Sequence, residues 1–250
     1  MKVAAYQAPR LRSGSLEAVD LIRTRVKWCE SHGVVILCCP EAILGGLADD
    51  AADPREFAID ARGDQLAHAL APLASDTVTT IVGFTEVTSA GRLYNTAAVF
   101  HKGSVVGLYR KLHPAINRSI YDAGDRMPVF EIDGLTFGIM ICNDSNYPEP
   151  ARMMAAQGAS VLFIPTNNSL PPEKADVAAH ARNVDIALAI QHGVSVVRAD
   201  VAGRADGMVS YGSSAIVDSR GHVLQSAQPM TEDLIVADLE VSPREGSAVR

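Results

Sequence analysis

An apolar run at residues 137–141 ends abruptly at Cys142, and a short polar stretch separates this cysteine from Pro148. A continuous apolar run bounded by turn residues is typical of a strand that is buried on both faces. Pro148 stands where a helix can begin, because its fixed φ suits the first helical turn. The stretch therefore predicts a strand, a sharp elbow that carries a thiol, and a helix. Open α/β sheets place ligands at the carboxyl ends of such strands, so Cys142 is a candidate functional residue.

Strand and helix patterns alternate from the first residues onward. Residues 2–7 and 34–39 have the character of buried strands, and an amphipathic helical pattern that ends at Gly33 lies between them. A strand, a helix and a strand in this order predict a parallel pair. We find no linker, repeat or low-complexity segment, so we expect one domain over residues 1–250.

Hairpin signals interrupt this alternation. Lys102-Gly103, Asp133-Gly134 and Ser219-Arg-Gly221 each join two short alternating segments, which predicts antiparallel strands. Pro171-Pro172 opens an Ala-rich helical pattern that runs to about Gln191. Parallel and antiparallel pairs must then share the same sheets. An α/β fold with two mixed sheets face to face and helices on the outer faces satisfies this order.

Composition narrows the classes of partner. The net charge is −7 with no basic tract, so we expect no nucleic-acid partner. No apolar run approaches the roughly 18 residues of a membrane span, and the amino end reads as a strand rather than a signal peptide. The cysteines lack zinc-ligand spacing, and adjacent Cys38 and Cys39 are unlikely to form a disulfide, so a reduced, cytoplasmic protein is the default expectation. Cys29 lies on the apolar face of the first helix, and adjacent Cys38 and Cys39 should point into two different layers.

Three reactive residues stand just past predicted strand ends. Glu41 follows the second strand, Lys111 follows a hairpin strand, and Cys142 ends the apolar run. A thiolate is a nucleophile, and an adjacent ammonium lowers the pKa of the thiol that forms it. A carboxylate can take the thiol proton, pass it to a leaving amine and later activate water. An ammonium and a backbone N–H can stabilise the oxyanion of a tetrahedral intermediate.

At these residues the sequence resembles the nitrilase superfamily of carbon–nitrogen hydrolases. The matching segments are Cys39-Pro-Glu-Ala42, Tyr109-Arg-Lys-Leu-His-Pro114 and Gly138-Ile-Met-Ile-Cys-Asn-Asp-Ser-Asn-Tyr-Pro-Glu149, with weaker matches at Val3-Ala-Ala-Tyr-Gln7, Tyr94-Asn-Thr-Ala97, Ile164-Pro-Thr-Asn167, Ala181-Arg182 and Tyr211-Gly-Ser-Ser-Ala-Ile-Val-Asp218. They occur in family order over nearly the whole chain.

The resemblance implies a four-layer αββα sandwich, homodimers or larger homo-oligomers, and no cofactor or metal. It carries over Glu41 as general base, Lys111 as oxyanion stabiliser and Cys142 as nucleophile. The backbone N–H of Asn143 would be the second oxyanion donor, and Asn167, after a strand end, is a candidate to line the pocket. The implied reaction is hydrolysis of a small amide through a thioester, with release of ammonia or an amine.

Two positions depart from the family pattern. Many members carry a second glutamate in the loop after the lysine, and Asn117 fills that place here. An amide can accept a hydrogen bond or hold a substrate N–H, but it supplies no charge. The residues after Cys142 resemble N-carbamoyl amino acid hydrolases, yet Ser145 and Asn146 replace the arginines that hold the substrate carboxylate there. We therefore do not expect an anchor for an α-carboxylate there. Nitrilases proper are usually longer and tend to have Trp-Glu after the cysteine, so amide or carbamoyl hydrolysis is favoured over nitrile hydrolysis.

Three other functions stay open from the sequence. The first is hydrolysis of an N-carbamoyl compound. The second is a catalytically silent protein of this fold that binds a metabolite or partner, which Asn117 favours. The third is a papain-like hydrolase that pairs Cys142 with His113, which the strand–helix order and the position of His113 before Cys142 disfavour.

Overall fold

The computed structural model describes residues 1–15, 17–114, 119–168, 177–205 and 207–240. Within these residues the strands form an eight-stranded and a six-stranded sheet. The larger sheet contains β1 (Lys2–Pro9), β2 (Ile36–Cys38), β3 (Thr79–Val87), β4 (Leu93–His101), β5 (Ser104–Arg110), β10 (Val201–Ala205), β11 (Met208–Tyr211) and β14 (Asp233–Asp238). The smaller contains β6 (Val129–Ile132), β7 (Leu135–Ile139), β8 (Val161–Pro165), β9 (Ser195–Ala199), β12 (Ala215–Val217) and β13 (Val223–Ser226).

Both sheets are mixed, as the alternation of patterns predicts. In the larger sheet β1, β2 and β3 are parallel, and β3, β4 and β5 continue as antiparallel hairpins. In the smaller sheet β7, β8 and β9 are parallel, whereas β6, β12 and β13 pair antiparallel. The predicted parallel pair of β1 and β2 is confirmed.

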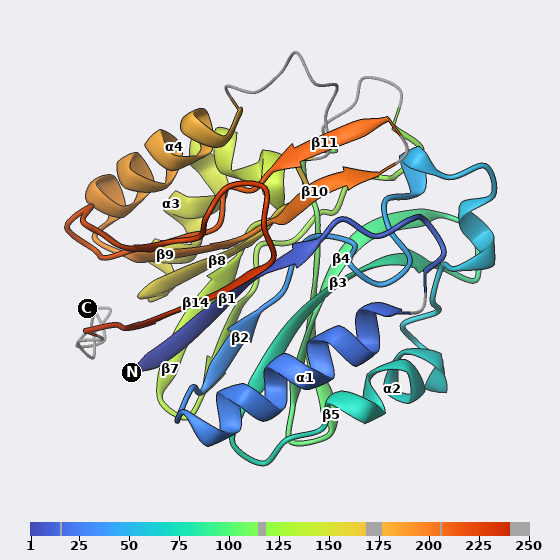
Figure 1. The fold of residues 1–250 in the computed structure, drawn as a ribbon, viewed down its shortest axis with the longest axis horizontal. Helices are drawn as coiled ribbons and strands as arrows, with labels where there is room; N and C mark the ends of the chain where they lie inside the picture. Colours follow the sequence, from blue (N-terminus) through green and yellow to red (C-terminus); the bar gives the residue numbers. More distant parts are fainter. Residues whose placement is uncertain (16, 115–118, 169–176, 206, 241–250) are drawn as a thin grey trace, which may run out of the picture.

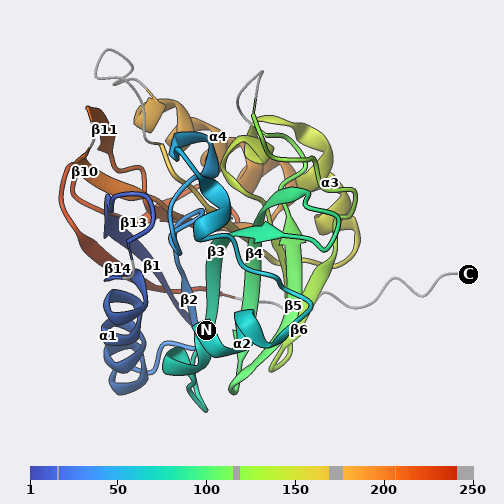
Figure 2. The same ribbon diagram turned by 90° about the vertical axis from the view of Figure 1, so that its right-hand side faces the viewer.

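The helices lie on the outer faces of the two sheets. α1 (Glu17–Ser31) and α2 (Asp64–Leu70) cover the larger sheet, and α3 (Pro148–Ala156) and α4 (Val177–His192) cover the smaller one (Figures 1 and 2). This is the expected αββα sandwich. α3 begins at Pro148, as its fixed φ predicts. The Ala-rich helix is described from Val177 onward, so its predicted start at Pro171-Pro172 lies outside the described residues.

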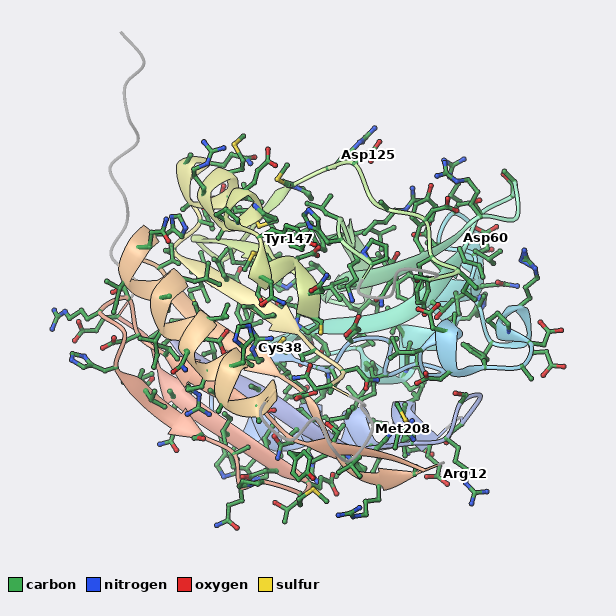
Figure 3. The ribbon with its side chains drawn as sticks, turned by 90° about the horizontal axis from the view of Figure 1, so that it is seen from above. Arg12, Cys38, Asp60, Asp125, Tyr147 and Met208 are labelled. Atoms are coloured by element: carbon green, nitrogen blue, oxygen red, sulfur yellow. The ribbon has the colours of Figure 1, made fainter. Side chains whose placement is uncertain are left out.

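Alternate side chains of the inner strands enter two separate cores. On β1, Val3 packs in the core between the two sheets, whereas Ala4 packs in the core under α1. Cys38 likewise faces the inter-sheet core, lying centrally in Figure 3, and Cys39 faces the other core, as predicted. This alternation follows from the two-residue period of a strand. Because side chains of both sheets interdigitate in the inter-sheet core, their packing sets the position of one sheet relative to the other.

The sequence analysis did not anticipate one hairpin. β10 and β11 pair antiparallel beyond β1 and extend the larger sheet. Their residues mix Gly203 and Arg204 with apolar positions, so the period-2 signal is weak, although Asp206-Gly207 is a turn dipeptide typical of hairpins in sequence.

No helix among residues 1–15, 17–114, 119–168, 177–205 and 207–240 is long and apolar enough to cross a membrane.

Candidate active site

The candidate site lies where the carboxyl ends of strands from both sheets meet. Glu41 follows β2, Lys111 follows β5, Cys142 follows β7 and Asn167 follows β8. The two edges are joined directly, because the Glu41 N–H donates to the Thr166 carbonyl at 3.3 Å. Residues that are distant in sequence therefore converge at one edge of the sandwich, as residues of ligand sites at the carboxyl ends of open α/β sheets do.

A close backbone approach fixes Glu41. Gly83 on β3 faces the turn after β2, and a Cβ on this glycine would lie 2.4 Å from the Ala42 nitrogen and 2.5 Å from the Pro40 oxygen. Ala42 itself has φ 47°, a left-handed conformation that non-glycine residues rarely adopt. The turn is thus held against β3 in a strained form, and it buries the Glu41 carboxylate.

The Glu41 carboxylate is surrounded by donors. Lys111 Nζ lies 2.6 Å from Oε1, and Asn95 Nδ2 donates to the same oxygen at 2.7 Å. The Asn167 N–H donates to Oε2 at 2.9 Å. Burial lowers the pKa of Lys111, but the acidic groups around it, Glu41 first among them, together outweigh that effect and raise the pKa above its usual value. Lys111 is therefore an ammonium at neutral pH.

Cys142 lies on the predicted elbow. It has φ 46° and opens a 3₁₀ helix, Cys142–Asn146, directly before α3. Asp144 holds this turn: its carboxylate accepts hydrogen bonds from the backbone N–H groups of Ile141, Leu112 and His113 and from the Tyr109 hydroxyl, at 2.8–3.1 Å. Asp144 thus fastens the elbow to the segment that carries Lys111.

The thiol itself is protonated at rest. Burial raises the pKa of Cys142 to about 12, and the Glu41 carboxylate adds to the rise. The cations Lys111 and Arg198 lower the pKa, but by less. The sequence predicted a thiol activated by an adjacent ammonium, and the Lys111 ammonium does lower the pKa of the Cys142 thiol. Its effect is outweighed because the same pocket excludes water and holds a carboxylate.

A buried arginine supports the elbow from β9. Arg198 pairs with Asp185 of α4 through Nη2 at 2.6 Å and Nε at 2.9 Å, and its Nη1 donates to Thr166 at 2.8 Å. Nη2 also donates to the Ser145 hydroxyl, which in turn donates to the Cys142 carbonyl at 2.7 Å. This chain of bonds ties the cysteine backbone to both β8 and α4.

The thiol faces a side-chain amide. Cys142 Sγ lies 3.8 Å from Asn168 Oδ1, and Asn168 is in turn bonded to the buried carboxylate of Asp200 and to Ser213. Asp200 follows β9, at the same carboxyl edge as the other site residues. Asn167 was predicted from the sequence, whereas Asn168, which follows it directly, was not.

The other predicted residues have definite places. The Asn143 side chain donates to the His113 carbonyl and accepts from Asn146. His113 stacks on Tyr147 and directs Nδ1 to Asp144 at 3.1 Å, which is the role of a supporting residue. Asn117 lies outside the described residues. In the described ranges, no three His, Cys, Asp or Glu side chains are grouped to hold a metal ion.

Comparison with known proteins identifies the family. Residues 2–245 match the family described as carbon-nitrogen hydrolase. This chain belongs to the carbon–nitrogen hydrolases. Through them it is a member of the nitrilase superfamily, as the motif resemblance indicated.

Individual relatives agree with this family. This chain is 29% identical to a hydrolase of Pseudomonas protegens, and the match covers 96% of this chain and 83% of the relative. It is 30% identical to the deaminated glutathione amidase of Escherichia coli, over 88% of this chain and 82% of that one. Among solved structures, an amidase from Nesterenkonia sp., with acrylamide added at its active-site cysteine, superposes with a TM-score of 0.80 at 23% identity, covering 96% and 93% of the two chains.

Several residues that shape the site of this hydrolase were not foreseen from the sequence. Asn95, Asn168, Arg198 and Asp200 all follow or lie within strands of ordinary composition. Asn95 falls inside one of the weaker family matches. Asn168 stands three places past the end of β8, and Asp200 one place past the end of β9. The position after a parallel strand is the signal that would have found the last two.

Proposed function

We propose that this protein hydrolyses the carbon–nitrogen bond of a small amide through a thioester on Cys142. Glu41 acts as the general base, and Lys111 and the Asn143 N–H stabilise the oxyanion. The observation that carries the proposal is the buried ion pair of Glu41 and Lys111, which acts electrostatically on the Cys142 thiol. A charged pair is costly to bury, and here it stands beside a nucleophile on a strained elbow.

Acylation begins from a neutral thiol. As sulfur attacks the amide carbon, Glu41 takes the thiol proton, because a thiol with a pKa of about 12 supplies little thiolate at neutral pH. The carbonyl oxygen becomes an oxyanion beside the Lys111 ammonium. Glu41 then passes the proton to the nitrogen, the carbon–nitrogen bond breaks, and ammonia or an amine leaves.

Deacylation uses the same groups in reverse order. Water attacks the thioester carbon while Glu41 accepts one of its protons. The tetrahedral intermediate again places its oxyanion by Lys111. It collapses by breaking the carbon–sulfur bond, the proton returns from Glu41 to sulfur, and a carboxylic acid is released. The three hydrogen bonds that Glu41 accepts keep the carboxylate in place through both half-reactions.

Relatives support an amide as the substrate class. The names of two compared proteins describe amidases, one acting on deaminated glutathione. At the positions after the cysteine, this chain presents Ser145 and Asn146 rather than arginines, and Ser145 is bonded to Arg198 and to the Cys142 carbonyl. Ser145 is thus part of the elbow's support, and no cation stands in its place to hold a substrate carboxylate.

The test is ammonia release from a panel of small amides, ω-amides of amino acids, N-carbamoyl compounds and nitriles. We expect release from at least one amide by the wild type and a loss of at least a thousandfold in Cys142→Ala, because the thiol forms the only covalent bond to the acyl group. Cys29→Ala is the matched control, since Cys29 lies on the buried face of α1, in the other core. Equal release by wild type and Cys142→Ala would disprove the proposal.

A further inference from the structure

Asp200 organises a small polar cluster beside the thiol. Its carboxylate is fully buried. Oδ1 accepts the N–H groups of Asn168 and Val201 at 3.0 and 2.8 Å. Oδ2 accepts the N–H and hydroxyl of Ser213 at 3.0 and 2.7 Å and the Asn168 side-chain Nδ2 at 3.2 Å. Five donors therefore converge on this carboxylate, and two of them belong to Asn168.

This cluster removes the usual ambiguity about which way an asparagine amide points. Asn168 Nδ2 donates to Asp200 Oδ2 and to the Ser213 hydroxyl, each at 3.2 Å. A carboxylate only accepts hydrogen bonds, so the amide nitrogen must face Asp200. The amide oxygen, Oδ1, must then face the opposite way, and it lies 3.8 Å from Cys142 Sγ.

The thiol is the donor to this oxygen only until the reaction starts. Once sulfur has attacked the substrate it carries no hydrogen, so Asn168 Oδ1 loses its S–H partner. At the same stage the substrate nitrogen lies next to the sulfur, on the carbon to which sulfur has bonded. If that nitrogen carries a hydrogen, it can replace the S–H as donor. An ester oxygen or a fully alkylated nitrogen cannot.

We propose that Asn168 Oδ1 accepts a hydrogen bond from the scissile nitrogen of the substrate, and so selects amides that carry an N–H over esters and N,N-dialkyl amides. The inference rests on the proposed function and names the substrate class of that site. Asp200 and Ser213 act as positioning residues, because they reach the substrate through Asn168 alone. No proton is transferred to Asn168; the proton for the leaving group still comes from Glu41.

The experiment compares an amide and an ester of the same acid. For the primary amide that the panel identifies and the methyl ester of the same acyl group, kcat/KM is measured in wild type, Asn168→Ala and Ser213→Ala. We expect Asn168→Ala to lower the amide-to-ester ratio of kcat/KM roughly tenfold to a hundredfold, the usual effect of losing one substrate hydrogen bond. Ser213→Ala should shift the ratio in the same direction by less, because it loosens the amide without removing Oδ1.

Both variants retain most of the Asp200 cluster. Asn168→Ala keeps the backbone N–H bond to Oδ1, and Ser213→Ala keeps the backbone N–H bond to Oδ2. An amide-to-ester ratio that stays unchanged while both rates fall together would overturn the inference, because it would mean that Asn168 only positions the thiol. Wild type that turns over neither substrate would instead refute the proposed hydrolase, which is a separate result.

Discussion

At the scale of single residues, both ends of the nucleophile–base pair are strained. Ala42, beside the base, and Cys142 both have φ near +47°, where a side chain costs about 1–2 kcal/mol. Such conformations persist only where the surroundings over-determine them. Here the missing side chain of Gly83 leaves room for the turn at Ala42. The four hydrogen bonds donated to Asp144 hold the turn at Cys142. These two strained turns carry the Glu41 carboxylate and the Cys142 thiol past their strand ends, close enough for the carboxylate to raise the pKa of the thiol.

The pKa of the thiol gives a prediction at this scale. Because the Glu41 carboxylate raises the pKa of Cys142, Glu41→Gln should lower it and increase the thiolate fraction at a given pH. We expect iodoacetamide to alkylate Cys142 of this variant faster than wild type at pH 8, while amide turnover falls by at least a hundredfold. The measurement is the alkylation rate against pH, followed by mass spectrometry of the Cys142 peptide.

Glu149→Gln provides the control, because Glu149 is an exposed carboxylate in the first turn of α3. Its alkylation profile should match wild type. Slower alkylation in Glu41→Gln would contradict this account: it would mean that Glu41 already holds the thiol proton in the resting enzyme and maintains a thiolate.

At the scale of elements, the sequence predicted what depends on local pattern. Buried strands, the β1–β2 parallel pair, the hairpins and the start of α3 follow from periodicity, turn dipeptides and proline. The β10–β11 hairpin was missed because its residues lack a clear alternation. The triad candidates were found because strand ends are visible in sequence, whereas the pairing of Arg198 with Asp185 joins a strand to a helix and leaves no local signal.

The fit of the Glu41 turn against β3 gives a prediction at this scale. In Gly83→Ala the new Cβ meets backbone atoms of Pro40 and Ala42, which cannot swing away as a side-chain end would. We expect a loss of about 1–3 kcal/mol of unfolding free energy, typical of overpacking, and at least a tenfold loss in kcat, because Glu41 must shift from Lys111. Urea unfolding and amide kinetics measure the two effects.

Gly63→Ala is the matched control. A Cβ at Gly63 meets nothing closer than Asp60 Oδ2 at 4.0 Å, and its φ of −95° suits alanine. This variant should retain wild-type kcat. If Gly83→Ala kept wild-type kcat as well, the close approach of β3 would not be what positions Glu41.

At the scale of the whole molecule, neither sheet carries the candidate site alone. Glu41 and Lys111 belong to strand ends of the larger sheet, and Cys142 and Asn168 to those of the smaller one. Their relative position depends on the apolar core between the sheets and on a few bonds across the edge, such as Glu41 N–H to Thr166. Sequence motifs named the triad, but these long-range contacts come only from the assembled sandwich.

The most direct test of the account is rapid-quench mass spectrometry of the protein during turnover of the best amide. We predict a protein species heavier by the acyl group, less the hydrogen lost from sulfur, with the added mass on the peptide that contains Cys142. The species should be absent in Lys111→Met, because the oxyanion then loses its ammonium. An adduct on another residue would contradict the assignment of Cys142 as the nucleophile.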